Sequence, residues 1–405
     1  MLISAPDHFK GYKALAFVIV FDMIITFSDW IKDNYVTLSS VKNNIAVCPP
    51  YFQSCLDYYF LDSTPYSYGQ NILYMFLGTI LFAALYFLYT EDYKKFAYFM
   101  SIPLLFKFMM LYIFTYLNTG NYNLLGLSMA MVLLYSKRKL YYLRILLIVF
   151  YLSAASIKLD KGYLTGGIFD SLQLGVPLFP HYMNSFLGIL FLILCLISPI
   201  LLFNKAKRIR VTYLVLLTLF HMYSIAVVGF RFPSLVIPTL WVIYFFEKDE
   251  FNYNIKTFFM EFIGPTVIIF TIILQSIPFI IKGDHVLTGE GYKFGYYMFL
   301  ANYQCVSTVT THNSNEEYKT YVSSSTKALY MCDPYIDYFR IKRSCDPGKV
   351  KNIEWTFDKS INGSPYMRII NIKNACKLEY SAFSHNDWIE LTPKILEITP
   401  EKNSI

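Results

Sequence analysis

Charged residues are scarce in this sequence, which also lacks repeats and nucleotide-binding loops. Only 16% of its 405 residues are Asp, Glu, Lys or Arg and 55% are hydrophobic, whereas a soluble domain carries roughly 25% charged residues. No internal repeat, low-complexity tract or glycine-rich phosphate loop is present. These absences argue against a soluble P-loop enzyme and favour a membrane protein.

A cleavage site for secretion is also absent from the N-terminal region. Residues 1–13 precede an apolar run over 14–31, which is longer than the core of a typical signal peptide and lacks an Ala-x-Ala motif. We therefore expect an uncleaved first transmembrane helix.

Nearly all long apolar runs lie before Ile281, and most approach the roughly 20 residues that a helix needs to cross hydrocarbon. Two of the runs, the fourth and the eighth, are shorter than this. Their helices could be tilted, extended by their neighbours or partly re-entrant. Residues 282–405 instead have the composition of a soluble domain with short strands and turns. We expect a polytopic α-helical membrane protein with about nine transmembrane helices over 1–281 and a small β-rich or α+β extracytoplasmic domain over 282–405. The nine runs lie near 14–31, 71–90, 97–117, 122–135, 140–157, 182–203, 209–230, 234–246 and 257–281, and the short ones are the fourth and the eighth.

Lysine and arginine are distributed unevenly between alternate loops. Thirteen lie in one set of loops and five in the alternating set. The positive-inside rule therefore predicts a cytoplasmic N-terminus and, after an odd number of spans, a C-terminal domain on the periplasmic, extracellular or luminal side. The basic residues form short clusters rather than one face, so we expect the lipid bilayer as a partner and no nucleic acid. The first set comprises 1–13, 91–96, 136–139, 204–210 and 247–256, and the second 32–70, 118–121, 158–181 and 231–233.

Six of the seven cysteines fall on the predicted outer side, and the seventh, Cys195, lies in an apolar run as a small core residue. An even number on an oxidising side favours disulfides, although six cysteines allow 15 pairings. Zinc is the alternative, but no close C-x-x-C pair is present, so we expect no metal. The six are Cys48, Cys55, Cys305, Cys332, Cys345 and Cys376.

Three ionisable side chains lie near the middle of apolar runs. Asp22, Lys107 and His221 each lie near the middle of a predicted helix, where an ionisable group costs a few kcal/mol and is a functional candidate by default. Asp22 and Lys107 could instead form a structural ion pair. His221 could act in catalysis or be a neutral imidazole that is hydrogen-bonded to a neighbouring helix.

Another basic residue closes the fifth run. Lys158 stands in the segment AASIKLDKGYLTGG, just before a loop that contains Gly162, Gly166 and Gly167. Glycines let a backbone approach a ligand or another helix closely. Lys158 could be an anchor whose amine reaches the membrane surface. Alternatively, a partly dry apolar pocket would lower its pKa and make it a base near neutral pH.

Five segments, in order along the chain, resemble the vitamin K-dependent γ-glutamyl carboxylase family and its bacterial relatives with a horizontally transferred transmembrane (HTTM) domain. The segment AASIKLDKGYLTGG is similar to the helix end of that family, with matches at Lys158, Leu159, Asp160, Tyr163 and Gly166. The other four segments are GYKALAFVIVFDMI with Asp22, LTLFHMYSIAVVGFRFP with His221, Gly229 and Phe232, GEGYKFGYYMFL after the last run, and IEWTFDKSINGSPYMRIIN with Cys345 upstream.

The resemblance implies a catalytic site and a cofactor. In the carboxylases the lysine that matches Lys158 is the base that deprotonates vitamin K hydroquinone, whose oxygenation generates a strong base for the glutamate γ-carbon. By this resemblance Lys158 and His221 are candidate catalytic residues. Gly162, Gly166 and Tyr163 are candidate contacts of a vitamin K-like quinone or hydroquinone.

The resemblance also implies a disulfide between Cys48 and Cys345, which would tie the outer domain to the membrane region. The chain departs from the carboxylase pattern in three ways. Ile157 replaces the first of two lysines, the stretch NTGNYNLLG lacks the histidine that assists the chemistry, and the propeptide-binding remainder is not found beyond Ile405. These departures favour a shared scaffold with altered chemistry over glutamate carboxylation itself.

Two functions fit these observations. The first is a carboxylase-like membrane enzyme, with vitamin K-dependent lyase or quinol-epoxidase chemistry, in which Lys158 is a base on a lipid-soluble quinol or an exported peptide. The second is a non-catalytic membrane factor that matures or binds an exported peptide or protein. A transporter would be expected to show inverted repeats, and the sequence shows none.

Overall fold

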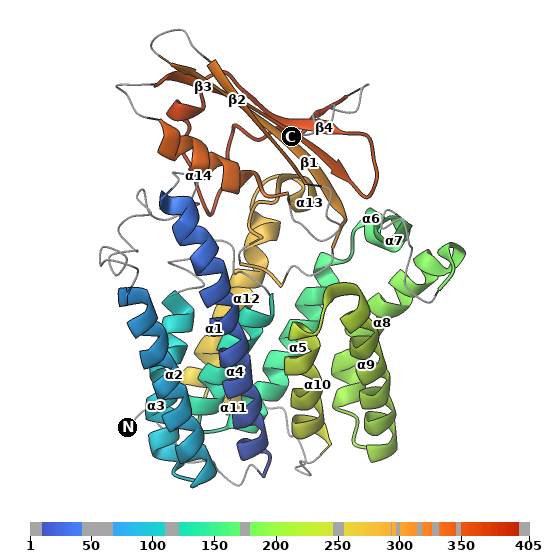
Figure 1. Cartoon of the computed structure of the whole chain (residues 1–405). Coiled ribbons are helices and arrows are strands. Elements are labelled where there is room, and N and C mark those ends of the chain that lie inside the picture. The colour runs from blue at the N-terminus through green and yellow to red at the C-terminus, as the bar shows by residue number, and fades with distance from the viewer. Residues whose placement is uncertain are drawn as a thin grey trace. The chain divides into compact units, whose positions relative to one another are not determined.

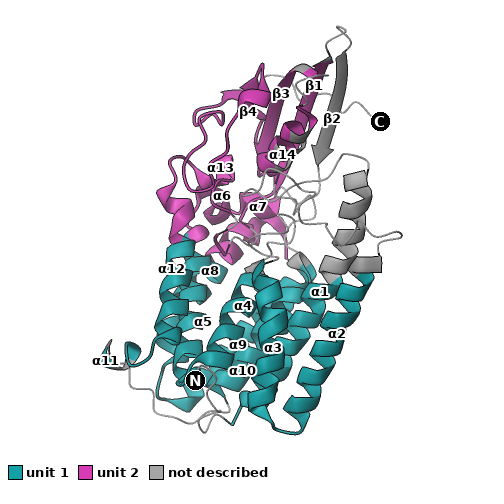
Figure 2. Ribbon diagram, turned by 90° about the vertical axis from the view of Figure 1, so that its left-hand side faces the viewer, with its two compact units in different colours: residues 1–35, 56–156, 190–275 teal, residues 36–55, 157–189, 276–405 magenta. Residues whose placement is uncertain are grey.

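The computed structural model divides the chain into two compact units, coloured separately in Figure 2. The first lies within Met1–Tyr35, Leu56–Ser156 and Leu190–Gln275, and the second within Val36–Cys55, Ile157–Ile189 and Ser276–Ile405. The residues that the structure describes are 10–42, 68–109, 121–170, 179–245, 255–292, 294–296, 300–313, 318–325, 332–345 and 350–396.

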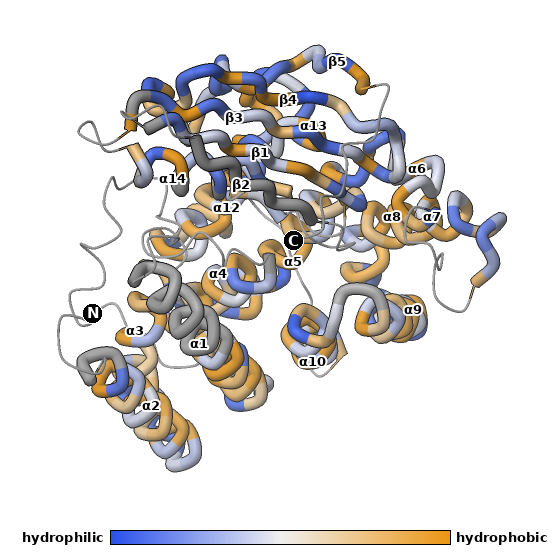
Figure 3. Tube along the Cα trace, turned by 45° about the horizontal axis from the view of Figure 1, so that its top comes forward, coloured by the Kyte–Doolittle hydropathy of each residue, from blue (hydrophilic) through white to orange (hydrophobic). Residues whose placement is uncertain are grey.

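A helix occupies part of each of the nine apolar runs (Figure 1). In the first unit α2 packs beside α3, and α9 beside α10. The sequences of α9 and α12 are apolar along most of their length, and hydropathy colouring of the chain shows largely apolar helices (Figure 3). The helices are α1 Tyr12–Lys42, α2 Tyr68–Tyr89, α3 Tyr93–Met109, α4 Asn121–Tyr135, α5 Lys139–Ile157, α8 Asn184–Leu202, α9 Lys207–Val228, α10 Arg231–Tyr244 and α12 Ile263–Ile280, with a short α11 at Ile255–Phe258.

Five helical segments among the described residues are long and apolar enough to cross a membrane. Large apolar side chains remain exposed on them, for example Met75 at 73%, Phe82 at 75% and Leu219 at 61%, as expected for surfaces that face lipid rather than water. The protein therefore has a helical membrane body, and the larger number of nine spans stays a prediction. The five segments are Asn71–Tyr89, Lys139–Ile157, His181–Leu202, Lys207–Ala226 and Ile263–Ile280.

The loop after α5 contains two single-turn helices, α6 (Lys161–Leu164) and α7 (Gly167–Asp170). The Asp160 carboxylate caps α6 by accepting a hydrogen bond from the Gly162 amide at 2.7 Å, because the first amides of a helix have no partner within it. Gly166 joins the two turns with a φ of 78°, a conformation that favours glycine. A 3-10 turn at His181–Met183 then leads into α8.

The C-terminal part of the second unit is an antiparallel sheet with the strand order β2-β1-β3-β4-β5. A turn at Asn362 and Gly363, with φ values of 54° and 74°, connects β3 to β4, and Asn-Gly is a preferred pair for left-handed turn positions. This sheet and the helix α14 confirm the predicted mixture of strands and helix. The elements are α13 His285–Thr288, β1 Tyr303–Asn313, β2 Tyr318–Ser325, α14 Pro334–Ser344, β3 Val350–Ile361, β4 Met367–Ile372, a 3-10 turn at Ala375–Lys377 and the two-residue β5 Lys394–Ile395.

The core of this domain is aromatic. Ile353, Trp355 and Phe357 alternate along β3 and are almost fully buried, as the two-residue period of a strand requires for one face. Trp355 packs 5.5 Å from the ring of Trp388, which stacks on Tyr338 of α14 at 5.4 Å. The sheet and α14 thus share one apolar core.

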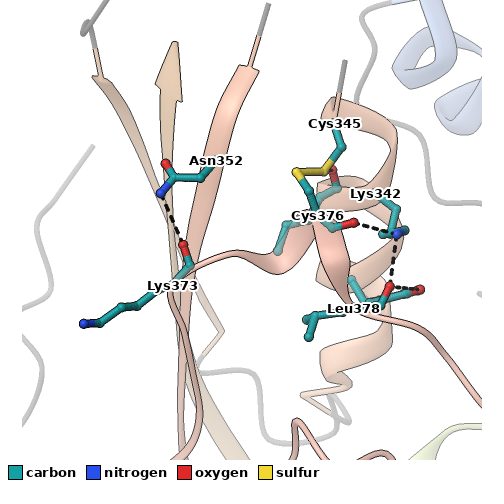
Figure 4. The surroundings of a disulfide bond; sticks show 8 residues. Lys342, Cys345, Asn352, Lys373, Cys376 and Leu378 are labelled. Atoms are coloured by element: carbon teal, nitrogen blue, oxygen red, sulfur yellow. Dashed lines mark hydrogen bonds between the residues drawn. A yellow bond between two sulfur atoms is a disulfide. The ribbon is translucent and has the colours of Figure 1, made fainter. Parts of the chain in front are cut away.

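Two disulfides close this domain, between Cys305 and Cys332 and between Cys345 and Cys376. The predicted Cys48–Cys345 disulfide is therefore wrong in this structure, because a cysteine sulfur forms only one such bond. Cys345 follows the end of α14, and Cys376 lies in the neighbouring 3-10 turn (Figure 4). Cys48 itself lies outside the described residues. The two bonds fit an oxidising, extracytoplasmic location for the C-terminal domain.

Candidate functional site

Lys158 is covered by protein rather than exposed at the membrane surface. Only 8% of the residue is accessible, and its amine lies 6.0 Å from the centre of the Tyr163 ring. A lysine that serves as a membrane anchor keeps its ammonium group among water and lipid headgroups. The burial of Lys158 therefore does not match an anchor, whereas the nearby Lys161 is exposed.

The glycines of the Lys158 loop let other parts of the second unit approach closely. A Cβ atom at Gly162 would lie 2.4 Å from the Asn362 side-chain nitrogen, and one at Gly166 would lie 2.7 Å from the backbone nitrogen of Ser185. Tyr163 is buried against Phe169, with ring centres 5.9 Å apart. These contacts give the loop residues a packing role, and their contact with a quinone remains a prediction.

His221 lies in an aromatic cluster within the first unit. Its Nε2 atom is 2.8 Å from the Tyr151 hydroxyl of α5, and the rings of Phe220 and Phe232 have their centres 4.9 and 5.4 Å away. The hydrogen bond to a neighbouring helix that the sequence allowed is thus present. The buried Nδ1 atom has no hydrogen-bond partner among the described residues, which costs about 1–3 kcal/mol unless a ligand or water satisfies it.

Asp22 and Lys107 form the ion pair that their positions allowed. The Lys107 amine lies 2.6 Å from the Asp22 carboxylate, and the two side chains are 0% and 4% exposed. The Lys107 amine also donates to the Thr26 hydroxyl at 3.0 Å, which in turn donates to the Asn123 side chain at 2.9 Å. This network satisfies two charges that would otherwise be costly inside the membrane body.

The predicted site residues divide between the two units. Lys158, Gly162, Tyr163 and Gly166 belong to one loop of the second unit, whereas His221 belongs to the first. No group of three or more potential metal ligands occurs in the described part of the chain.

Sequence reasoning did not identify a second polar network, which surrounds Glu290. This residue is 2% exposed, and its carboxylate accepts hydrogen bonds from the backbone and side chain of Asn386 at 2.8 and 2.9 Å. Its other oxygen lies 2.8 Å from Nδ1 of His385. Glu290 lies in the GEGYKFGYYMFL segment, but its partners are almost 100 residues away, so no local pattern could reveal the pairing.

Sequence reasoning also did not select Lys359 or Tyr151. Lys359 is fully buried on β3, and Tyr151 supplies the partner of His221. The signal for Lys359 was its position, which continues the alternating apolar series of Ile353, Trp355 and Phe357. A lysine on a buried strand face requires partners.

Comparisons of this chain with protein-family models, with curated proteins and with solved structures found no match.

Proposed function

We propose that this protein is a carboxylase-like integral membrane enzyme in which Lys158 acts as a base on a lipid-soluble quinol. The observation that carries the proposal is the burial of Lys158 at the end of α5, where it is 8% exposed. Only a neutral amine accepts a proton, so the proposal requires Lys158 to be in that form when the quinol binds.

The chemical step is a single proton transfer. The neutral Lys158 amine takes the proton of a quinol hydroxyl, so that the lysine becomes an ammonium ion and the quinol becomes a quinolate. The quinolate is the form that reacts with molecular oxygen, which supplies the oxidant. The positive charge that forms on Lys158 lies near the face of the Tyr163 ring, and an aromatic face stabilises a cation.

His221 is a separate candidate contact, within the first unit, for an aromatic ligand. Its ring is buried among Tyr151, Phe220 and Phe232. Its Nδ1 atom lacks a partner among the described residues, so a hydroxyl of an aromatic ligand would complete its hydrogen bonding. Aromatic side chains suit the flat ring of such a ligand, which can stack on them.

The proposal is tested with purified protein in lipid nanodiscs and a reduced naphthoquinone that carries an isoprenoid tail. We expect the wild-type protein to accelerate oxygen consumption by this quinol above the rate without protein. Lys158→Arg should abolish the acceleration, because arginine stays protonated at any working pH. Lys161→Arg is the matched control, since Lys161 is exposed three residues further on, and it should keep the wild-type rate.

Lys158→Met separates a base from a structural cation. If Lys158 is only a buried charge, arginine should preserve activity and methionine should destroy it. If it is a base, both variants lose activity while their melting temperatures stay close to the wild-type value. Full activity of Lys158→Arg, or no acceleration by the wild-type protein, would overturn the proposal and favour the non-catalytic maturation factor.

A further inference from the structure

Lys359 occupies a position where the pattern of its strand calls for an apolar residue. It follows Ile353, Trp355 and Phe357 on the buried face of β3 and is 0% exposed. Long-chain amines are almost never fully buried without partners. The partners of Lys359 therefore indicate what the residue does.

Those partners lie on the turn that follows the last membrane helix, α12. The Lys359 amine donates hydrogen bonds to the backbone oxygens of Val286 and Leu287, at 3.2 and 2.8 Å. Both oxygens belong to the short helix α13, which Asp284 caps by accepting from the Val286 amide. One side chain of the sheet thus holds the α13 turn against β3.

The face of the Tyr303 ring covers the same amine, with the ring centre 4.4 Å from Nζ. The Tyr303 hydroxyl is hydrogen-bonded to that of Tyr292, four residues beyond the end of α13. The cluster therefore joins β1, β3 and the segment after α13, all within the second unit.

Burial acts against the charged form of this amine. Asp333 and Asp284 favour its charged form, but burial outweighs them and lowers the pKa of Lys359 from 10.5 to about 7. Asp284 and Asp160 also act on Tyr303, and burial is the largest cause that raises the pKa of that phenol. The neutral amine has two N–H groups, which match the two backbone oxygens that accept from it.

The direction of the pH effect follows from these values. In an open state, in which the α13 turn has moved off β3, the exposed Lys359 amine has its ordinary pKa of 10.5. In the closed state described above, the buried amine has a pKa of about 7. Between these values the open state binds more protons, so raising the pH favours the closed state by up to about tenfold per pH unit. Below pH 7 both states are protonated, and the preference for closure is at its lowest and constant.

We propose that Lys359 is a pH-responsive latch that closes the α13 turn onto the sheet of the C-terminal domain in mildly alkaline conditions and loosens it in acidic ones. The latch acts on the segment that connects the last membrane helix to this domain. It is independent of the role proposed for Lys158.

The test is hydrogen exchange measured by mass spectrometry on the full chain in detergent, for peptides that cover residues 285–292. Exchange is followed from pH 6 to pH 9 and corrected for the intrinsic pH dependence of amide exchange. We expect protection to be constant below pH 7 and to rise above it by up to about tenfold per pH unit. Lys359→Met should abolish the rise.

Lys342→Met is the matched control, because the Lys342 amine also donates to two backbone oxygens, those of Cys376 and Leu378, at 2.9 and 3.0 Å (Figure 4). This variant should keep the wild-type pH response of residues 285–292. Wild-type protection that stays flat or falls above pH 7 would overturn the latch, as would a rise that persists in Lys359→Met. The dependence of wild-type protection on pH tests the latch even if a variant fails to fold.

Discussion

The ion pair between Asp22 and Lys107 shows how a single glycine can protect charges inside a membrane body. Gly126 of α4 lies against the Asp22 carboxylate, and a Cβ atom there would be only 2.3 Å from Oδ2. The absence of a side chain at Gly126 leaves the space in which the carboxylate meets the Lys107 amine. A buried pair depends on such geometry, since its attraction must offset the loss of hydration.

Gly126→Ala should therefore destabilise the protein by roughly 1–3 kcal/mol, because the added methyl group overpacks the ion pair. Thermal unfolding in detergent measures the effect. Gly78→Ala is the control, since Gly78 is also helical but has nothing within 4 Å of its Cβ position. The control should be neutral or stabilising by up to about 1 kcal/mol. Equal effects of the two substitutions would contradict this account of Gly126.

At the scale of elements, the disulfides join strands and helices of the C-terminal domain to one another. Cys345 lies directly after α14, and its partner Cys376 lies 31 residues further along the chain, after β4. The Lys342 amine binds the Cys376 and Leu378 carbonyls beside this bond (Figure 4). The end of α14 is thus attached to the segment after β4 by a covalent bond and two hydrogen bonds.

Peptide mapping without reduction should find Cys305 linked to Cys332 and Cys345 linked to Cys376, with Cys195 as a free thiol. Replacing Cys345 and Cys376 together by serine should lower the free energy of unfolding of the domain by about 3–4 kcal/mol in the chain-entropy model for a loop of this length. A peptide that links Cys345 to Cys48 would contradict the pairing seen here.

At the scale of the whole molecule, the basic loops and the disulfides indicate the same orientation. The basic cluster of Lys205, Lys207 and Arg208, at the start of α9, is predicted to be cytoplasmic. The domain with two disulfides lies on the side predicted to be oxidising. These are independent signals, because one arises during membrane insertion and the other from redox chemistry.

Thiol reagents that cannot cross a membrane test this orientation in intact cells. A cysteine at Asp387, which is exposed in the C-terminal domain, should react from outside. A cysteine at Ala206, exposed at the start of α9, should react only after lysis. The chain without either substitution gives the background reaction with the thiol reagent. The reverse pattern of reaction would show that the topology is inverted.

The sequence by itself determined the features that depend on composition and local pattern. Apolar runs predict helices because a helix satisfies its own backbone hydrogen bonds in hydrocarbon, and each run does contain a helix. The polar composition after Ile281 predicted a separate kind of fold, which is the sheet with α14. The depths of Asp22 and Lys107 allowed their pairing, because the positions of both residues along apolar helices could be counted.

Only the tertiary structure decided which distant residues meet. Cys345 pairs with Cys376 rather than Cys48, Glu290 with His385, and Lys359 with the α13 turn. Each pairing joins segments whose approach depends on how strands and turns pack, and six cysteines permit 15 pairings without that information. The burial of Lys158 was likewise undecided, because the same helix-end lysine can face headgroups or protein. Local sequence determines the form of each segment, whereas contacts between segments are selected by the packing of the whole fold.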